Sequence, residues 1–156
     1  MSPRADVSMT PDEIADLLSR PMTGVLSTLD RAGAPHSAGM WFTPHKDELR
    51  MWTYAKSQKA VNLRRDPRCA FLIEEGTAYN ELRGVLVKGA ATLLTDYDEV
   101  VAIGTALYDR YTLPATGVEA LAGPIAEIER QARKRVGIAL SLDNVASWDH
   151  SKLGTV

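Results

Sequence analysis

The sequence predicts a mainly β protein: an antiparallel barrel of six strands, closed or partly closed, with peripheral helices. Short segments of alternating apolar and polar residues are separated by turn signals. The long apolar segment 81–94 contains Gly84 and Gly89, and glycines inside such a strand are typical of bends at barrel corners. Two helical segments come before the last strand. We expect one domain over 1–156, with residues 1–10 flexible.

Composition limits the possible functions. The chain has 156 residues, of which 45% are hydrophobic and 24% charged, as in ordinary soluble globular proteins. A net charge of −2 gives no overall field for nucleic acid or an anionic membrane, so neither partner is expected. The single cysteine, Cys69, excludes an internal disulfide and predicts a cytoplasmic protein. No apolar run approaches the roughly 18 residues of a membrane span.

The first half of the chain reads as a helix followed by a meander. Thr10 and Pro11 should cap and begin a helix that stops before Pro21. Strands are then expected at 23–30, 35–43 and 49–55, and we expect each to pair with the next. Small residues in the middle of the second strand, including Gly39, indicate close approach by a backbone or a ligand. Asp66-Pro67 should end a short helix over 57–66.

The second half adds the rest of the barrel and two helices. The apolar run 69–73 predicts a strand buried on both faces, and 81–94 a long strand after it. Thr95 and Asp98 resemble a capping box that opens a helix, which should break between Leu113 and Gly117. A second helix is expected over 118–134 and the last strand over 136–142, with a tail beyond it.

The segment 50–74 holds the most informative cluster. Between residues 56 and 68, five basic side chains face one acid, Asp66. Ser57 stands where the helix should begin, and the free N–H groups and positive dipole end there favour phosphate. A basic helix alone is more often a solvated face, but this one follows the aromatic strand end at Trp52 and Tyr54. We therefore expect the phosphate of a planar, flavin-like cofactor to bind here. The basic residues are Lys56, Lys59, Arg64, Arg65 and Arg68.

The same segment resembles a known superfamily. Thr53-x-x-x-Ser57-x-Lys59, followed by Asn62-Leu63-x-x-Asp66-Pro67-Arg68 and an apolar strand, is similar to the split-barrel flavin and deazaflavin oxidoreductases. This is the superfamily of pyridoxamine 5′-phosphate oxidase, and the resemblance runs from about residue 17 to 148. The tail SWDHSKL is similar to its actinobacterial branch, which often uses a deazaflavin. The resemblance implies a six-stranded split barrel and a homodimer.

By the same resemblance, the deazaflavin coenzyme F-420 lies in a groove at the dimer interface. Hydride then passes to or from a small unsaturated organic substrate. Strand ends would flank the ring system, Lys56, Ser57 and Lys59 would hold the phosphate, and a partner's last strand would close the pocket. The residues implied as cofactor-binding are Met40, Trp41, Phe42, Thr53, Tyr54, Lys56, Ser57, Lys59, Asn62, Arg64 and Trp148.

Several alternatives stay open. The same fold could bind FMN as an oxidase or reductase, or could carry a cofactor without catalysis. A barrel that binds single-stranded nucleic acid is a third possibility, against which the net charge of −2 counts. The vitamin B6 oxidase reaction is not expected, because Gln58 replaces the arginine of true pyridoxamine phosphate oxidases and the tail SKLGTV lacks their basic motif.

Other conspicuous residues have structural explanations. The basic residues at 130–135 complement the dipole at a helix C-terminus. Trp52 is either a core aromatic or a ring contact, and Cys69 should be an inert core thiol. His36, His45 and His150 show no metal-ligand spacing, so no metal site is expected. The sequence identifies no catalytic residue.

Overall fold

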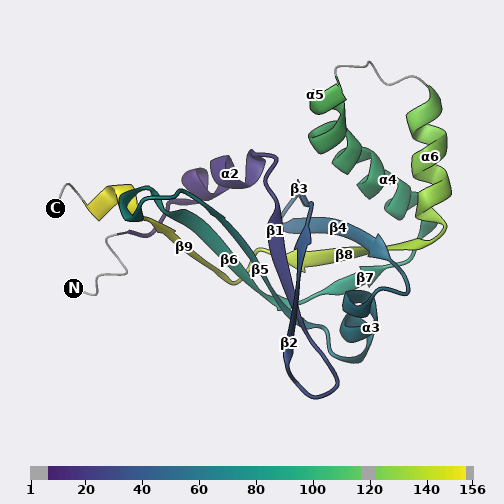
Figure 1. The fold of residues 1–156 in the computed structure, drawn as a ribbon, viewed down its shortest axis with the longest axis horizontal. Helices are drawn as coiled ribbons and strands as arrows, with labels where there is room; N and C mark the ends of the chain where they lie inside the picture. The colour runs from purple at the N-terminus through teal and green to yellow at the C-terminus, as the bar shows by residue number, and fades with distance from the viewer. Residues whose placement is uncertain (1–6, 117–121, 154–156) are drawn as a thin grey trace.

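The computed structural model describes residues 7–116 and 122–153 and shows two antiparallel sheets (Figure 1). The five-stranded sheet has the order β2 (Pro35–Met40), β1 (Gly24–Leu29), β5 (Arg68–Glu75), β6 (Arg83–Ala90) and β9 (Val145–Asp149). The four-stranded sheet has the order β3 (Thr43–His45), β4 (Glu48–Tyr54), β8 (Arg135–Ser141) and β7 (Thr92–Leu94). The predicted class, a mainly β split barrel with peripheral helices, is confirmed.

The chain passes from one sheet to the other at two points. Trp41 and Phe42 separate β2 from β3, and Ala91 separates β6 from β7. The predicted strands 35–43 and 81–94 are therefore each divided, and β9 forms within the expected tail. This gives nine strands in the described residues instead of the six predicted. The expected meander is wrong at its last step, because β4 pairs with β3 and β8 and not with β2.

The core lies between the two sheets. Alternation along each strand sends one set of side chains inward, among them Leu26, Phe71 and Ile138, all fully buried. Phe42 enters the core at the crossing between β2 and β3 and meets Phe71 edge-on, with 5.4 Å between ring centroids. Close packing of this kind fixes how the two sheets meet, and so fixes the strand ends that flank the site.

Two helices pack against strands of the barrel. In α2 (Pro11–Ser19) the Thr10 side chain accepts from the Glu13 N–H while the Glu13 carboxylate accepts from the Thr10 N–H, which makes a complete capping box. Leu17 and Leu18 of this helix enter the core. Helix α3 (Gln58–Arg65) begins after Ser57 and ends at Asp66, as predicted from Pro67.

The remaining helices gather on the side of the four-stranded sheet (Figure 1). Helix α4 (Tyr97–Leu107) is capped by Asp96, whose side chain accepts from the Glu99 N–H, and not by the predicted Thr95–Asp98 box. The chain continues as a π-helical turn, η2 (Tyr108–Thr112), and a short helix, α5 (Leu113–Thr116). The break predicted between Leu113 and Gly117 is therefore wrong as far as Thr116, because the chain is still helical there. Pro114 falls in the first turn of α5, where its missing N–H is tolerated. Residues 117–121 lie outside the described residues, and α6 runs over Ala122–Ala132.

Strand β5 differs from its prediction of burial on both faces. Phe71 and Ile73 are fully buried, whereas Ala70 and Leu72 on the opposite face are only half-buried. On that outer face Ala70 lies opposite the exposed Lys88 of β6 and Leu72 lies opposite Leu86, so the strand is fully buried on its inner side alone. Cys69 is half-buried, and burial raises the pKa of its thiol to about 11, in keeping with an inert thiol. Among the described residues, no helix is long and apolar enough to cross a membrane.

Gly24→Ala tests the packing between β1 and β5. A Cβ at this position would lie 2.2 Å from Cζ of Phe71, which is too close for the core to absorb without moving the ring. We expect the substitution to lower the free energy of unfolding by about 1–3 kcal/mol, measured by urea titration. Gly39→Ala on β2 is the control, because its Cβ would meet only Thr23 Cγ2 at 3.4 Å. Equal unfolding midpoints for the two variants would contradict this account of the core.

Candidate functional site

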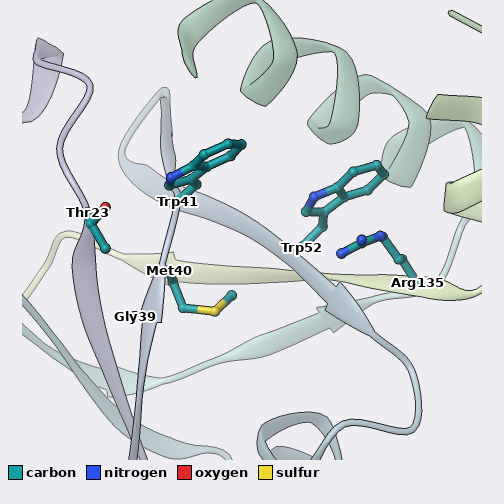
Figure 2. Close-up of a pocket in the computed structure, with 6 residues that line it drawn as sticks. All are labelled: Thr23, Gly39, Met40, Trp41, Trp52 and Arg135. Carbon is teal, nitrogen blue, oxygen red and sulfur yellow. The ribbon is translucent and has the colours of Figure 1, made fainter. Parts of the chain in front are cut away.

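An open cavity of about 440 Å³ lies where the end of β2 faces β4 and β8. Figure 2 shows the indole rings of Trp41, just after β2, and Trp52, on β4, below a helix. It also shows the Arg135 side chain reaching under Trp52. The cavity is lined by Thr23, Gly39, Met40, Trp41, Trp52 and Arg135.

Trp41 is the exposed aromatic surface of this cavity. It lies at the crossing between the sheets, with 48% of its surface exposed. One face of its indole stacks on Tyr111, with centroids 4.7 Å apart and planes within 1°. The Tyr111 hydroxyl donates to the Met22 carbonyl (2.7 Å) and accepts from the Phe42 N–H (3.3 Å). The indole is thus held in a fixed orientation, suited to stacking against a planar ring.

Trp52 and Tyr54 hold the guanidinium of Arg135 between them. Its Cζ lies 4.4 Å from the Trp52 ring centroid and 4.1 Å from that of Tyr54, within the range of cation–π interaction. Trp52 itself packs against α4 at Gly104, where a Cβ would lie 2.5 Å from its ring. Trp52 therefore packs against a helix and also lines the cavity. The two interpretations of Trp52 from the sequence, as a core aromatic or as a ring contact, do not exclude each other.

The N-terminus of α3 is the polar part of the site, linked to the cavity lining by the electrostatic interaction between Lys59 and Arg135. Ser57 caps the helix, and its Oγ accepts from the Ala60 N–H (3.3 Å) and shares a hydrogen bond of 3.1 Å with Thr53 Oγ1. The first turn of α3 contains no acidic side chain. Free N–H groups at such a helix start favour an anion.

Lys59 and Arg135 bring two positive charges to this helix start without an acid beside them. Among the described residues, neither side chain forms an ion pair. Burial lowers the pKa of Lys59 below its usual value, and the nearby Arg135 charge lowers it further. The Nε of Arg135 is buried and has no hydrogen-bond partner there. An uncompensated pair of cations with an orphaned donor fits a phosphate or other anionic group.

Two of the residues predicted as cofactor-binding line this cavity, and several others lie around the start of α3. Met40 and Trp41 line it, and Tyr54 contacts Arg135 of its lining. Thr53, Ser57 and Lys59 meet at the start of α3, and the exposed Lys56 lies one residue before its cap. Arg64 is on the same helix, but its guanidinium donates to the Ala55 carbonyl (2.7 Å).

Phe42 and Asn62 need a different role from the one predicted. Both are fully buried. The Asn62 amide donates to Thr28 Oγ1 (3.0 Å) and its oxygen accepts from the Gln58 amide (2.8 Å), so its side chain ties α3 to β1. Phe42 belongs to the core. In this conformation neither side chain faces the cavity, and both position the groups that do.

Trp148 lies elsewhere in the chain, on the outer face of the five-stranded sheet. Its ring covers Gly84 of β6, and its Nε1 donates to a Glu74 carboxylate oxygen at 3.0 Å. It does not line the cavity of its own chain. Its predicted contact, from a partner subunit, stays a prediction.

Arg135 is the residue that sequence reasoning missed. The basic run at 130–135 was attributed to the dipole of the preceding helix, yet Arg135 is the first residue of β8 and pairs with Tyr54 across the ladder. That pairing places its side chain beside Trp52. Only the register between β4 and β8 carries this information, and the sequence of either strand alone does not show it.

The family model described as pyridoxamine 5′-phosphate oxidase matches residues 10–149. The chain belongs to this family. The match covers both sheets, α3 and the helices over the four-stranded sheet, so the whole cavity lies within the family's own fold.

Solved structures agree with this membership. A conserved hypothetical protein from Mycobacterium tuberculosis is 38% identical, with 100% of this chain and 94% of that chain covered and a TM-score of 0.89. A structure named F420 reductase is 27% identical, with 83% and 93% covered and a TM-score of 0.63. A FAD and heme binding protein from Mycobacterium smegmatis shares the fold, with 16% identity and a TM-score of 0.68. The match covers 92% of this chain and 72% of that chain. A search of curated protein sequences gave no significant match.

Lys59→Met tests the unpaired charge. Removing a partly desolvated cation that repels Arg135 should raise the free energy of unfolding of the unliganded protein by up to about 1 kcal/mol, since solvent screens the partly exposed charge; urea unfolding measures it. Lys56→Met removes an equal charge from an exposed position and should change stability by no more than about 0.5 kcal/mol. A loss of stability in Lys59→Met would mean that Lys59 already has a favourable partner.

Proposed function

We propose that the protein is an oxidoreductase that binds the deazaflavin coenzyme F-420 in this cavity and transfers hydride to or from a small unsaturated organic substrate. The observation that carries the proposal is a pair of unpaired cations: Lys59 at the start of α3, and Arg135, which lines the cavity together with the exposed Trp41. A basic anion site next to a fixed aromatic surface suits a cofactor with a phosphate and a planar ring.

Each part of the cavity has a distinct task in this proposal. Lys59 and Arg135 neutralise the phosphate, and the free N–H groups of α3 donate to its oxygens. Trp41, held by Tyr111, provides a flat apolar face for the ring system. The exposed Lys56 extends the positive charge outward, where an anionic oligoglutamate tail would leave the cavity.

The protein's contribution to the reaction is binding and orientation. When bound, the reduced deazaflavin supplies a hydride and is oxidised in the same step, and the acceptor takes up the hydride and one proton. The described residues contain no group of three or more His, Cys, Asp or Glu side chains that could hold a metal ion. Water at the open side of the cavity can deliver the proton, so no dedicated acid is required.

The choice of deazaflavin over FMN rests on sequence similarity. The structure named F420 reductase has 27% identity over 83% of this chain. An FMN-dependent oxidase or reductase remains the alternative that a direct titration distinguishes.

Titration of the apo protein with F-420 and with FMN, followed by fluorescence, tests the proposal. We expect saturable F-420 binding that is at least tenfold tighter than FMN binding. Lys59→Met and Arg135→Met should each weaken it by more than tenfold, because each leaves part of the phosphate charge uncompensated. Lys134→Met, an exposed cation next to Arg135 in the chain, is the matched control and should bind normally. If FMN binds more tightly than F-420, the proposed cofactor is wrong and FMN takes its place. If all variants bind F-420 with equal affinity, the proposed anion site is wrong.

A homodimer forms part of the same proposal. Part of the outer face of the five-stranded sheet, between the charged Glu74 and Lys88, is apolar and open: Val25 is 39% exposed, and Leu72 and Leu86 beside it are half-buried. Gly39 and Trp148 lie on the same face, and Gly39 also lines the cavity. A second copy packed here would cover the apolar surface and could bring the partner subunit's Trp148 toward the cofactor ring.

Val25→Lys combined with Leu72→Lys should convert the dimer into a monomer, since it places charges in the centre of the apolar face. Sedimentation velocity measures the mass, and circular dichroism checks that the fold is kept. Val61→Lys is the control, because Val61 is 43% exposed on α3, away from this face. A dimer that survives the double substitution would place the interface elsewhere.

A further inference from the structure

The π-helical turn η2 joins the inserted helices to the segments that border the cavity. Its consecutive residues Arg110 and Tyr111 form hydrogen bonds with groups that lie 69 to 92 positions earlier in the sequence. Single π-helical turns inside helices are rare, and they are frequent at functional sites. The turn therefore connects the inserted helices to distant parts of the chain beside the candidate site.

We propose that Tyr111 is a positioning residue for the ring of the bound cofactor, that it acts through Trp41, and that Arg110 holds the turn in place for it. This inference rests on the proposed function, because it requires a planar ring that binds against Trp41. It gives the inserted helices a part in cofactor binding, although the basic segment 56–68 lies outside them.

Trp41 depends on a neighbour for its orientation. It lies between β2 and β3, outside the strand pairings of either sheet, and 48% of its surface is exposed. The ring that stacks on it is that of Tyr111, with centroids 4.7 Å apart and planes within 1°. Because an aromatic pair of this kind prefers a narrow set of geometries, the orientation of the phenol ring determines that of the indole.

The Tyr111 ring is fixed in turn by its hydroxyl group. The hydroxyl donates to the Met22 carbonyl (2.7 Å) and accepts from the Phe42 N–H (3.3 Å). Each of these backbone groups is next in the sequence to a residue that lines the cavity, Thr23 for the first and Trp41 for the second. One hydroxyl therefore joins the two backbone segments that border the cavity on this side.

Arg110 anchors the same turn to the end of α2. Its guanidinium donates to the carbonyls of Leu18 (2.6 Å), Ser19 (2.9 Å) and Arg20. Helix α2 has no basic residue in its own last turn, so Arg110 supplies donors to carbonyls that the helix leaves unpaired. Its Cζ also lies 4.8 Å from the Phe42 ring centroid, so the same side chain contacts the crossing between β2 and β3.

These contacts give the cofactor ring a surface that exists before it binds. Both anchors of the turn are backbone groups, which hold Tyr111 in place whether or not the cavity is filled. A surface ordered in advance lowers the cost of ordering side chains on binding. The anion site rests on other contacts, since Arg135 is held by Trp52 and Tyr54. Loss of the Tyr111 ring should therefore weaken ring binding and leave phosphate binding intact.

Tyr111→Leu tests the inference with two probes, F-420 and the deazariboflavin that has the same ring system without the phosphate. Fluorescence titration should show both bound about tenfold more weakly, and by the same factor, because only the ring loses its support. Lys59→Met should weaken F-420 alone. Tyr97→Leu is the matched control, because its hydroxyl also donates to a helical carbonyl, that of Glu129 (3.3 Å), but Tyr97 does not line the cavity. Unchanged binding in Tyr111→Leu, or a loss confined to F-420, would overturn the role of Tyr111.

A double-mutant cycle shows whether Tyr111 acts through Trp41. In the Trp41→Ala background, Tyr111→Leu should weaken F-420 binding by less than about twofold, because the indole that it orients is absent. Equal losses in both backgrounds contradict action through Trp41. Tyr111→Phe keeps the stacked ring and should bind F-420 within about threefold of the unsubstituted protein. Circular dichroism checks the fold of each variant, and Tyr111→Phe carries the test if Tyr111→Leu does not fold: a loss above tenfold there would overturn the role of the ring.

Titration of the unsubstituted protein separates this inference from the proposed function. Saturable F-420 binding that Tyr111→Leu does not change overturns the positioning role and leaves the proposed function intact. If FMN binds and F-420 does not, the proposed cofactor is wrong, and the same cycle with FMN decides the role of Tyr111. If neither cofactor binds, both the positioning role and the proposed function are overturned.

Discussion

The crossing between β2 and β3 is the constraint on which the site depends. Two adjacent residues there point to opposite sides: Phe42 enters the core against Phe71, and Trp41 faces the cavity. Tyr111 fixes both, since its ring stacks on Trp41 and its hydroxyl bonds the Phe42 backbone. A shift in the core packing would therefore rotate the exposed indole. The barrel and its aromatic surface cannot be altered independently at this point.

The unpaired positive charges of the site destabilise the unliganded protein. Lys59 is partly desolvated and repelled by Arg135, and Arg135 keeps a buried Nε without a partner. Two aromatic rings hold the guanidinium in place of a carboxylate. Cation–π contacts fix the position of the charge while leaving its field available, which a salt bridge would cancel. This arrangement makes sense where the missing negative charge comes from a ligand.

The sequence predicted the local parts of this structure well and the non-local parts poorly. The Ser57 cap, the end of α3 before Pro67 and the hairpin of β1 and β2 all follow from neighbouring residues. Burial of Asn62 and the place of Arg135 depend on contacts with Thr28 and Tyr54, which are distant in sequence. The division of 81–94 at Ala91 likewise reflects sheet crossing, which periodicity along one strand does not encode.

The aromatic wall of the cavity joins two separate parts of the chain. Trp41 and Trp52 lie at or near strand ends and line the cavity, and the same two indoles also contact the helices inserted between β7 and β8. Changes at Leu107 or Ile128 would therefore alter the helical side of the indoles without touching Lys59 or Arg135. The fold alone does not determine function, so the strand ends and the inserted helices can vary separately on one barrel.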